Sequence, residues 1–263
     1  MRIRIADIMT REIVYYDHDF RKECARFCNS RRIKVLPDIR SRDTCYKFEN
    51  GQFKREPIHE DQFVQAHTHI FQPGLAARFN TYNILFVREE EELVGVVHFC
   101  DYNHPRVYEA CYQKLYQLER GALRLAEQGN ELTEQDLAKF LKGKNTREGT
   151  SRPLKVYHFH QRSTSLKDIL EFVQHHRGLK FKNLKKIHEV RNRIAHSLSI
   201  VRKHNPDQGS RNYDMAAFDK FMVGMEALLL AHRQVNNRLY FNLAKEQGNF
   251  NIDVNTVRQT LHY

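Results

Sequence analysis

Three residues combine the types and spacing that a chemical reaction needs: Arg191, Asn192 and His196. An RNA chain can be cut by its own 2′-hydroxyl, which attacks the adjacent phosphate. This reaction needs an acid or base that works near neutral pH, and histidine has a suitable unperturbed pKa of ~6.5. It also needs a cation beside the phosphorane, and a guanidinium offers phosphate oxygens a fork of donors. These residue types suit RNA cleavage of this kind, which requires no metal ion.

The segment that carries these residues is predicted to be helical. If residues 183–198 form one helix, a step of five residues turns the chain by ~500°, so Arg191 and His196 lie ~140° apart. One such helix does not bring the two side chains together. Two copies that pack across a two-fold axis can place both pairs in one cleft.

Helical periodicity extends over the whole C-terminal half. One apolar stripe recurs at steps of three and four residues, which is typical of an amphipathic helix, and consists of Val107, Cys111, Leu115, Leu118, Ala122 and Leu125. Three further helices are expected, at residues 133–141, 165–176 and 215–241. Polar loops are expected at residues 142–153 and 205–213. The sequence therefore predicts an all-α domain over 105–241, followed by a polar tail over 242–263.

This half resembles HEPN-domain ribonucleases. Arg191-Asn192, three further residues and His196 are similar to the RxxxxH motif of that family, and they lie on a late helix before a long final helix. The resemblance implies a homodimer with a composite site and a 2′,3′-cyclic phosphate product. Arg191 and His196 would be catalytic, and Asn192 would orient the histidine or the phosphate. The resemblance also implies a role in a toxin–antitoxin or antiviral system, with an antitoxin as a further partner.

Basic residues around the motif are candidates for contacts to RNA phosphates, which position a nucleic acid without reading its sequence. They are Lys182, Lys185, Lys186, Arg193 and Arg202, with Lys180 beside them. For any one of them the alternative is a solvated helix face. Weaker candidates for the same cleft lie on the first long helix, namely Glu119, Arg120 and Arg124. The RNA substrate is left open, with tRNA among the candidates.

The first hundred residues alternate strand and helix signals. Short β-type runs are found at residues 13–16, 34–39, 84–87 and 93–99, and helical spacing at residues 20–28 and 75–79. Asn50-Gly51 between two apolar runs predicts a tight hairpin. The two β/α cycles form a loose internal duplication.

This N-terminal half resembles a pair of CBS domains. Residues 6–14, 32–37 and 93–101 are similar to the opening, the first core strand and the closing segment of the CBS motif. The resemblance implies a nucleotide-sensing domain over 1–104, with an adenine nucleotide as a regulatory ligand. Asp101 would bind ribose hydroxyls, and His98, which replaces the usual Ser or Thr, would bind phosphate. The alternative is a CBS pair that serves only for dimerisation.

Charge separates the two halves of the chain. Residues 1–104 contain 16 Lys+Arg and 16 Asp+Glu, whereas residues 105–263 contain 27 and 16 and so carry the whole net charge of +11. Only the second half is therefore expected to meet a polyanion. No apolar run approaches the ~18 residues of a membrane helix. The start of the chain lacks the apolar stretch of a signal peptide, so a cytoplasmic protein without membrane contact is expected.

The cysteines do not suggest a disulfide framework, because their number, five, is odd and their spacing irregular. Cys24 and Cys28 are expected in the core rather than in a zinc site. The overall prediction is an α+β protein: a CBS-like β/α pair followed by a HEPN-like helical bundle. Two functions follow from it. One is a nucleotide-regulated endoribonuclease without a metal cofactor, and the other is an inactive dimeric adaptor that binds RNA or a protein.

Overall fold

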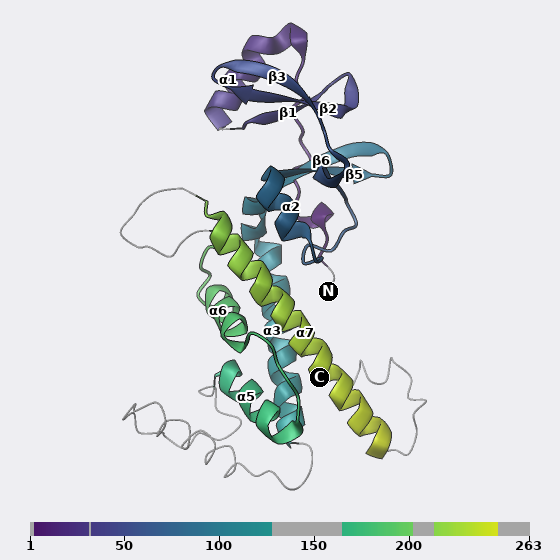
Figure 1. The fold of residues 1–263 in the computed structure, drawn as a ribbon, viewed down its shortest axis with the longest axis vertical. Coiled ribbons are helices and arrows are strands. Elements are labelled where there is room, and N and C mark those ends of the chain that lie inside the picture. Colours follow the sequence, from purple (N-terminus) through teal and green to yellow (C-terminus); the bar gives the residue numbers. More distant parts are fainter. Residues whose placement is uncertain (1–2, 32, 128–164, 202–212, 247–263) are drawn as a thin grey trace, which may run out of the picture. The chain divides into compact units, whose positions relative to one another are not determined.

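The structure is a computed structural model that describes residues 3–31, 33–127, 165–201 and 213–246 (Figure 1). It shows a mixed α+β fold, as the sequence predicts. The chain divides into two compact units. The first comprises Met1–Val107 and Ile200–Phe218, and the second comprises Tyr108–Ser199 and Asp219–Tyr263.

The first unit begins with two short 3-10 helices, a helix and an antiparallel sheet. These are η1 (Ile5–Asp7), η2 (His18–Phe20), α1 (Arg21–Arg31), β1 (Val35–Asp38), β2 (Ser41–Glu49) and β3 (Gln52–Pro57). The sheet order is β1-β2-β3. Asn50 and Gly51 join β2 to β3 with φ angles of 51° and 78°. Two successive positive φ values are those of the hairpin turn that the Asn-Gly pair favours, so the predicted hairpin is confirmed.

A second set of elements follows. It consists of η3 (Glu60–Gln62), β4 (Phe63–Gln65), α2 (Leu75–Tyr82), β5 (Ile84–Glu89), β6 (Glu92–His98) and η4 (Phe99–Asn103). β4 pairs with β5 in parallel, and β5 pairs with β6 antiparallel. In the first set, Tyr16 likewise forms a parallel bridge to Asp38 of β1. A strand segment, a helix and an antiparallel strand pair therefore occur twice.

The core of the first unit forms around each sheet. One cluster contains Tyr16, Cys24, Cys28, Leu36 and Phe48, and the other contains Cys45, Ile58, Phe63 and Phe86. All five thiols of the chain are free. The core placement predicted for Cys24 and Cys28 is confirmed, and burial raises the pKa of Cys28 to about 11.

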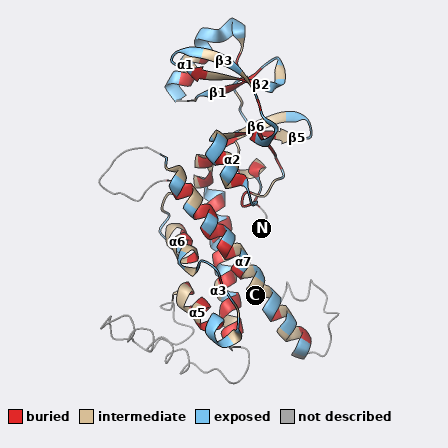
Figure 2. Cartoon of the chain, viewed as in Figure 1, coloured by how far each residue is buried: buried red, intermediate tan, exposed pale blue. Residues whose placement is uncertain are grey.

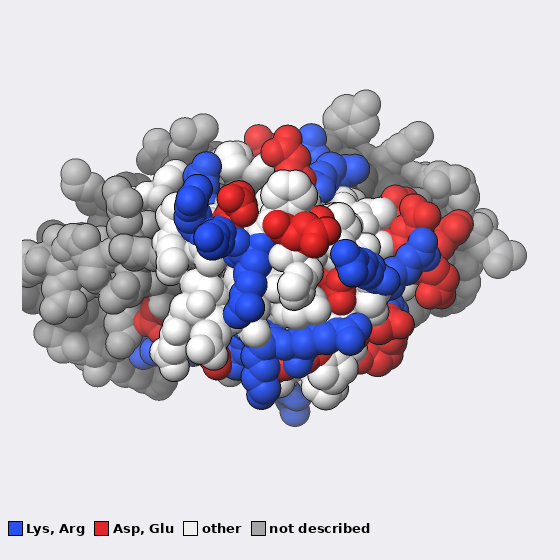
Figure 3. Space-filling view, turned by 90° about the horizontal axis from the view of Figure 1, so that it is seen from above, with Lys and Arg blue, Asp and Glu red and all other residues white. Residues whose placement is uncertain are grey.

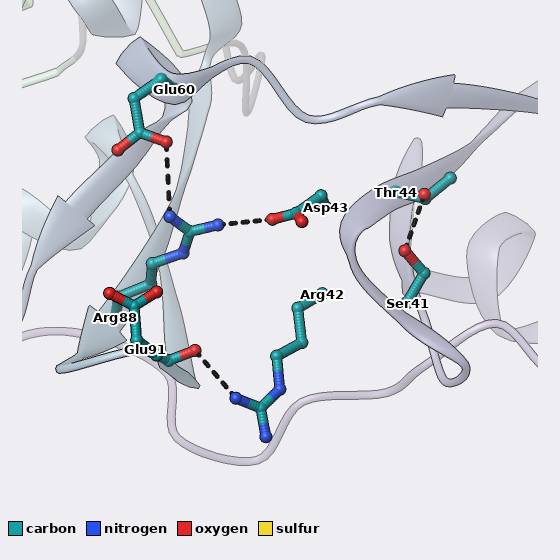
Figure 4. Close-up of polar contacts among 7 residues, drawn as sticks. All are labelled: Ser41, Arg42, Asp43, Thr44, Glu60, Arg88 and Glu91. Atoms are coloured by element: carbon teal, nitrogen blue, oxygen red, sulfur yellow. Dashed lines mark hydrogen bonds and ion pairs between the residues drawn. The ribbon is translucent and has the colours of Figure 1, made fainter.

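An arginine links elements of the two sheets (Figure 4). The guanidinium of Arg88 lies 3.1 Å from the centroid of the Phe63 ring, and its side chain is only 11% exposed. It donates to Asp43 Oδ1 at 2.7 Å and to Glu60 Oε2 at 3.4 Å. Stacking on the ring and pairing with two carboxylates keep this largely buried charge satisfied. Arg88 therefore joins β5 to both β2 and η3.

Charges of the first unit are largely paired with one another. Ion pairs join Arg40 to Asp19, Arg42 to Glu92, Lys47 to Glu49, Lys54 to Glu56 and Arg55 to Asp38. On the face shown in Figure 3, Lys and Arg lie interspersed with Asp and Glu. This pattern agrees with the neutral balance of residues 1–104, and it offers a polyanion no single-sign surface on that face.

The second unit consists of helices. They are α3 (Pro105–Glu127), α5 (Leu166–Arg177), α6 (Leu184–Ala195) and α7 (Met215–Glu246), and no strand lies in the described part of 105–263. The predicted stripe of α3 is buried from Val107 to Leu125 (Figure 2). None of the described helices is both long and apolar enough to cross a bilayer. The helix predicted at 133–141 and the loop at 142–153 lie outside the described residues.

Local signals set the ends of α5 as predicted. The Ser165 hydroxyl accepts a hydrogen bond from the Asp168 amide at 3.2 Å, and Gly178 ends the helix with a φ of 65°. α7 is longer than predicted, since it continues to Glu246 into the segment assigned to the polar tail.

The first unit also takes residues that the sequence placed in the helical domain. Phe218, at the start of α7, lies 5.6 Å from the Phe79 ring and 4.8 Å from the Tyr102 ring, between centroids. The Ile200 amide donates to Asn103 Oδ1 at 2.8 Å. These contacts place Ile200–Phe218 in the first unit, so the division differs from the expected boundary at residue 104.

Close helix contacts hold α6 in the second unit. A Cβ on Gly224 of α7 would lie 2.5 Å from Val190 Cγ2 and 2.9 Å from the Lys186 carbonyl oxygen. Only glycine allows this approach of α7 to α6. On α5, Arg177 donates to the carbonyl oxygens of Leu125 and Ala126, which satisfies the end of α3.

Candidate functional site

The predicted catalytic residues lie at the C-terminal end of α6. The helix ends at Ala195, so the expectation of a helix to residue 198 is wrong. His196 is the C-cap, with its amide bonded to the Asn192 carbonyl at 3.1 Å. Ser197 then adopts a left-handed φ of 49°, which ends the helix. The angle of ~140° expected between Arg191 and His196 assumed a continuous helix, and the helical rotation holds only up to Ala195.

The side chains of Arg191 and His196 are both exposed to solvent. Arg191 NH1 donates to Asn192 Oδ1 at 3.3 Å. This bond fixes the Asn192 amide so that Nδ2 faces His188 Nε2, at 3.1 Å. In the structure Asn192 thus orients Arg191 and contacts His188, and its role in orienting His196 or the phosphate stays a prediction.

His188 is a residue that the sequence reasoning missed. Its position four residues before Asn192 on a predicted helix was the signal for this contact. When Nε2 accepts from Asn192, the proton of the neutral imidazole lies on Nδ1. That nitrogen is enclosed and has no hydrogen-bond partner among the described residues. Leaving such a donor unpaired costs about 1–3 kcal/mol of stability.

A carboxyl group of α3 lies close enough to Arg191 for the two to interact electrostatically. Glu119 is half-buried, and burial raises the pKa of its carboxyl, while the charge of Arg191 acts to lower it. Eleven residues earlier on α3, the Tyr108 hydroxyl donates to the Leu198 carbonyl oxygen at 2.9 Å. The stretch of α3 between Tyr108 and Glu119 therefore runs beside the segment from Arg191 to Leu198.

The basic residues predicted to contact RNA have different environments. Lys182 and Lys185 are exposed, as is Lys180. Lys186 forms an ion pair with Glu189 at 2.9 Å. Arg193 donates to the Ser199 carbonyl oxygen at 2.6 Å, which ties it to the turn after α6. Arg202 lies outside the described residues.

An open depression lies apart from these residues. It measures about 460 Å³ and is lined by Glu171, Gln174, His175, Gly178, Leu179 and Lys180, at the end of α5. Arg191, Asn192 and His196 do not line it. The candidate site is therefore an exposed helix end on this chain rather than a closed pocket.

The two residues predicted to bind a nucleotide form a capping box at the start of η4. The His98 amide donates to Asp101 Oδ2 at 2.7 Å, and the Cys100 amide donates to His98 Nδ1 at 3.1 Å. Burial lowers the pKa of His98 to about 4 and raises the pKa of Asp101 to about 6. Both side chains thus support the turn after β6, and their role as nucleotide ligands stays a prediction.

Comparisons of the chain with family models, with curated proteins and with solved structures find no match. The resemblance of either half to a known family consequently rests on the sequence motifs alone.

Proposed function

We propose that the helical unit is a metal-independent endoribonuclease in which Arg191 and His196 act on the scissile phosphate. The observation that carries the proposal is the exposure of both side chains at one end of α6. Arg191 donates a hydrogen bond to Asn192, whose amide nitrogen in turn contacts His188. A guanidinium and an imidazole that are open to solvent can reach a phosphodiester, whereas paired or enclosed groups cannot.

The proposed reaction uses the 2′-hydroxyl of the RNA as the nucleophile. His196 takes the proton from this hydroxyl, the 2′-oxygen bonds to phosphorus, and the bond from phosphorus to the 5′-oxygen breaks. A second imidazole donates a proton to the leaving 5′-oxygen, which gives a 2′,3′-cyclic phosphate and a 5′-hydroxyl. Arg191 balances the charge of the phosphorane. In this scheme two copies of the chain form a homodimer and supply the acid and the base.

The exposed lysines Lys180, Lys182 and Lys185 would hold the RNA backbone. For the first unit we propose regulation by an adenine nucleotide that binds near His98 and Asp101. Such a ligand must bind the active and inactive states with different affinity in order to change cleavage. A cytoplasmic role in a toxin or antiviral system, with an antitoxin as partner, belongs to the same proposal.

The first experiment incubates the full chain with total RNA and EDTA, with and without adenine nucleotides. We expect cleavage that resists EDTA, that leaves 2′,3′-cyclic phosphate ends and that disappears in His196→Ala and Arg191→Ala. Lys220→Ala, a change elsewhere on the second unit, should cleave like the wild type. RNA binding without cleavage under every nucleotide condition would instead support the inactive adaptor.

A second experiment tests the shared site. Arg191→Ala and His196→Ala chains are mixed under conditions that exchange subunits. If Arg191 of one copy works with His196 of the other, the mixture regains part of the activity that each variant lacks. A mixture that stays as inactive as its components contradicts a site built from both copies.

A further inference from the structure

α3 exposes two tyrosines on adjacent turns. Tyr112 is 61% exposed and Tyr116 is 53% exposed. Residues four apart on a helix lie on one face, about 6 Å from each other. Arg120 continues the same row by another turn and is also exposed. The other side of α3, from Val107 to Leu125, is buried, so these three side chains form an outward row.

This row lies beside the candidate site. Tyr112 is one turn from Tyr108, whose hydroxyl bonds to Leu198, two residues after His196. Tyr116 lies three residues before Glu119. The charge of Arg191 acts to lower the pKa of the Glu119 carboxyl. The Tyr108–Leu198 hydrogen bond therefore places the tyrosines alongside the segment from Arg191 to His196, and the effect of the Arg191 charge on Glu119 agrees with this placement.

The chemistry of the row suits an unpaired stretch of nucleic acid. Aromatic side chains stack on exposed base faces, and an arginine can contact the backbone or stack as well. In a duplex the base faces are already covered by their neighbours, so a tyrosine on a rigid helix cannot reach them. Exposed Arg120 lies in the row itself and exposed Arg191 on the segment beside it, against one exposed carboxylate, Glu109, about one turn before Tyr112. This balance favours a polyanion as the occupant.

We propose that Tyr112 and Tyr116 form a stacking platform for two unpaired bases of RNA, with Arg120 on the adjacent backbone. The platform rests on the proposed ribonuclease function, because it places the unpaired stretch next to Arg191 and His196. It makes the enzyme select single-stranded segments with little preference for base identity. Stacking is tolerant of sequence, since every base has an aromatic face.

The test measures binding of a short single-stranded 2′-O-methyl RNA that contains 2-aminopurine. This RNA lacks the attacking hydroxyl, so binding is separated from cleavage. In the full chain, Tyr112→Ala and Tyr116→Ala should each weaken binding about tenfold, and the double variant about a hundredfold. Tyr→Phe at both sites should bind like the wild type. Quenching of 2-aminopurine should be lost with Ala and kept with Phe.

Two further variants keep the test specific. Tyr→Leu at both sites keeps apolar area but removes the flat ring, so it should bind as weakly as Ala. Phe241→Ala removes an aromatic side chain that is 57% exposed on α7, and it should bind like the wild type. Binding of the corresponding duplex should not change with any of these variants.

Several outcomes overturn the platform. One is unchanged RNA binding in the double Tyr→Ala variant. Another is a double Tyr→Leu variant that binds the RNA as tightly as the double Tyr→Phe variant. A third is that light scattering gives a lower molar mass for the Ala variants than for the wild type. That result would assign this face to contact with a second copy of the chain. Failure of the nuclease proposal looks different: cleavage would persist in His196→Ala while the stacking results stand.

Discussion

The hydroxyl of Tyr108 donates a 2.9 Å hydrogen bond to the carbonyl oxygen of Leu198, across ninety residues of sequence. It ties the first turn of α3 in the second unit to the chain just after His196. Within α6 the same turn is held by Arg193, which donates to the Ser199 carbonyl oxygen, and by the Leu198 amide, which donates to the Arg193 carbonyl oxygen at 2.8 Å. The Tyr108 bond therefore also supports the position of the candidate catalytic histidine.

Tyr108→Phe removes only this hydroxyl. We expect the free energy of unfolding to fall by about 1 kcal/mol, because the half-buried Leu198 carbonyl loses its partner. Cleavage should fall more than binding, since His196 loses its support. Urea unfolding and RNA cleavage measure the two effects. Tyr112→Phe, which removes an exposed hydroxyl from the same helix, serves as the control and should leave stability unchanged.

The contact of Gly224 with α6 gives a second prediction. In Gly224→Ala the new Cβ meets Val190 and the Lys186 carbonyl oxygen at distances that atoms do not adopt, so α6 must move. We expect a loss of about 1–3 kcal/mol in stability, as for overpacked cores, and a loss of cleavage. Val223→Ala, at the exposed neighbouring position, should change stability by less than about 1 kcal/mol. Thermal unfolding at matched concentrations compares them, and a Gly224→Ala chain as stable and active as the wild type would contradict the close packing.

The bond between Asn192 and Arg191 predicts coupling between them. Asn192→Ala should lower cleavage by about tenfold, because the guanidinium loses the group that orients it. In Arg191→Ala the same change should add little, since the oriented group is already gone. A double-mutant cycle on cleavage rates measures this coupling. Independent, additive losses would show that Asn192 acts through His188 alone.

The capping box at η4 predicts opposite pH effects for its two members. The pKa of His98 is about 4 in the folded chain and 6.5 in its unperturbed state. Between pH 6.5 and 4 the unfolded chain binds a proton that the folded one does not, so His98 lowers stability as pH falls. His98→Asn keeps a cap acceptor and should gain about 1–2 kcal/mol over the wild type when pH falls from 7 to 4.5.

For Asp101 the change of stability with pH has the opposite sign, because the pKa of its carboxyl is raised from 3.8 to about 6. Its contribution to stability is full below pH 3.8 and is lost as pH rises through 6, where the folded carboxyl ionises. Asp101→Asn should therefore gain stability over the wild type as pH rises from 4 to 7. Urea unfolding over this range tests both variants. Parallel trends for the two would contradict the described burial.

Local chemistry made several elements predictable. The Asn50-Gly51 turn, the ends of α5 at Ser165 and Gly178, and the buried stripe of α3 depend on side chains close in sequence. Their positions followed from turn, cap and periodicity rules without knowledge of the remaining fold. The exposure of Arg191 and His196 also agrees with a motif that must meet a substrate.

Other features needed partners that sequence spacing does not reveal. α6 ends at Ala195 rather than at residue 198, where Arg193 reaches the Ser199 carbonyl and Tyr108 reaches Leu198.

The sequence by itself determined the α+β composition, the hairpin, the main helices and a candidate pair of catalytic residues, because these depend on local propensity and residue type. Only the tertiary structure decided that Phe218 belongs to the first unit, that Tyr108 bonds to Leu198, and that Tyr112 and Tyr116 remain exposed. Such relations join residues tens of positions apart, and burial and packing fix them only when the helices have come together.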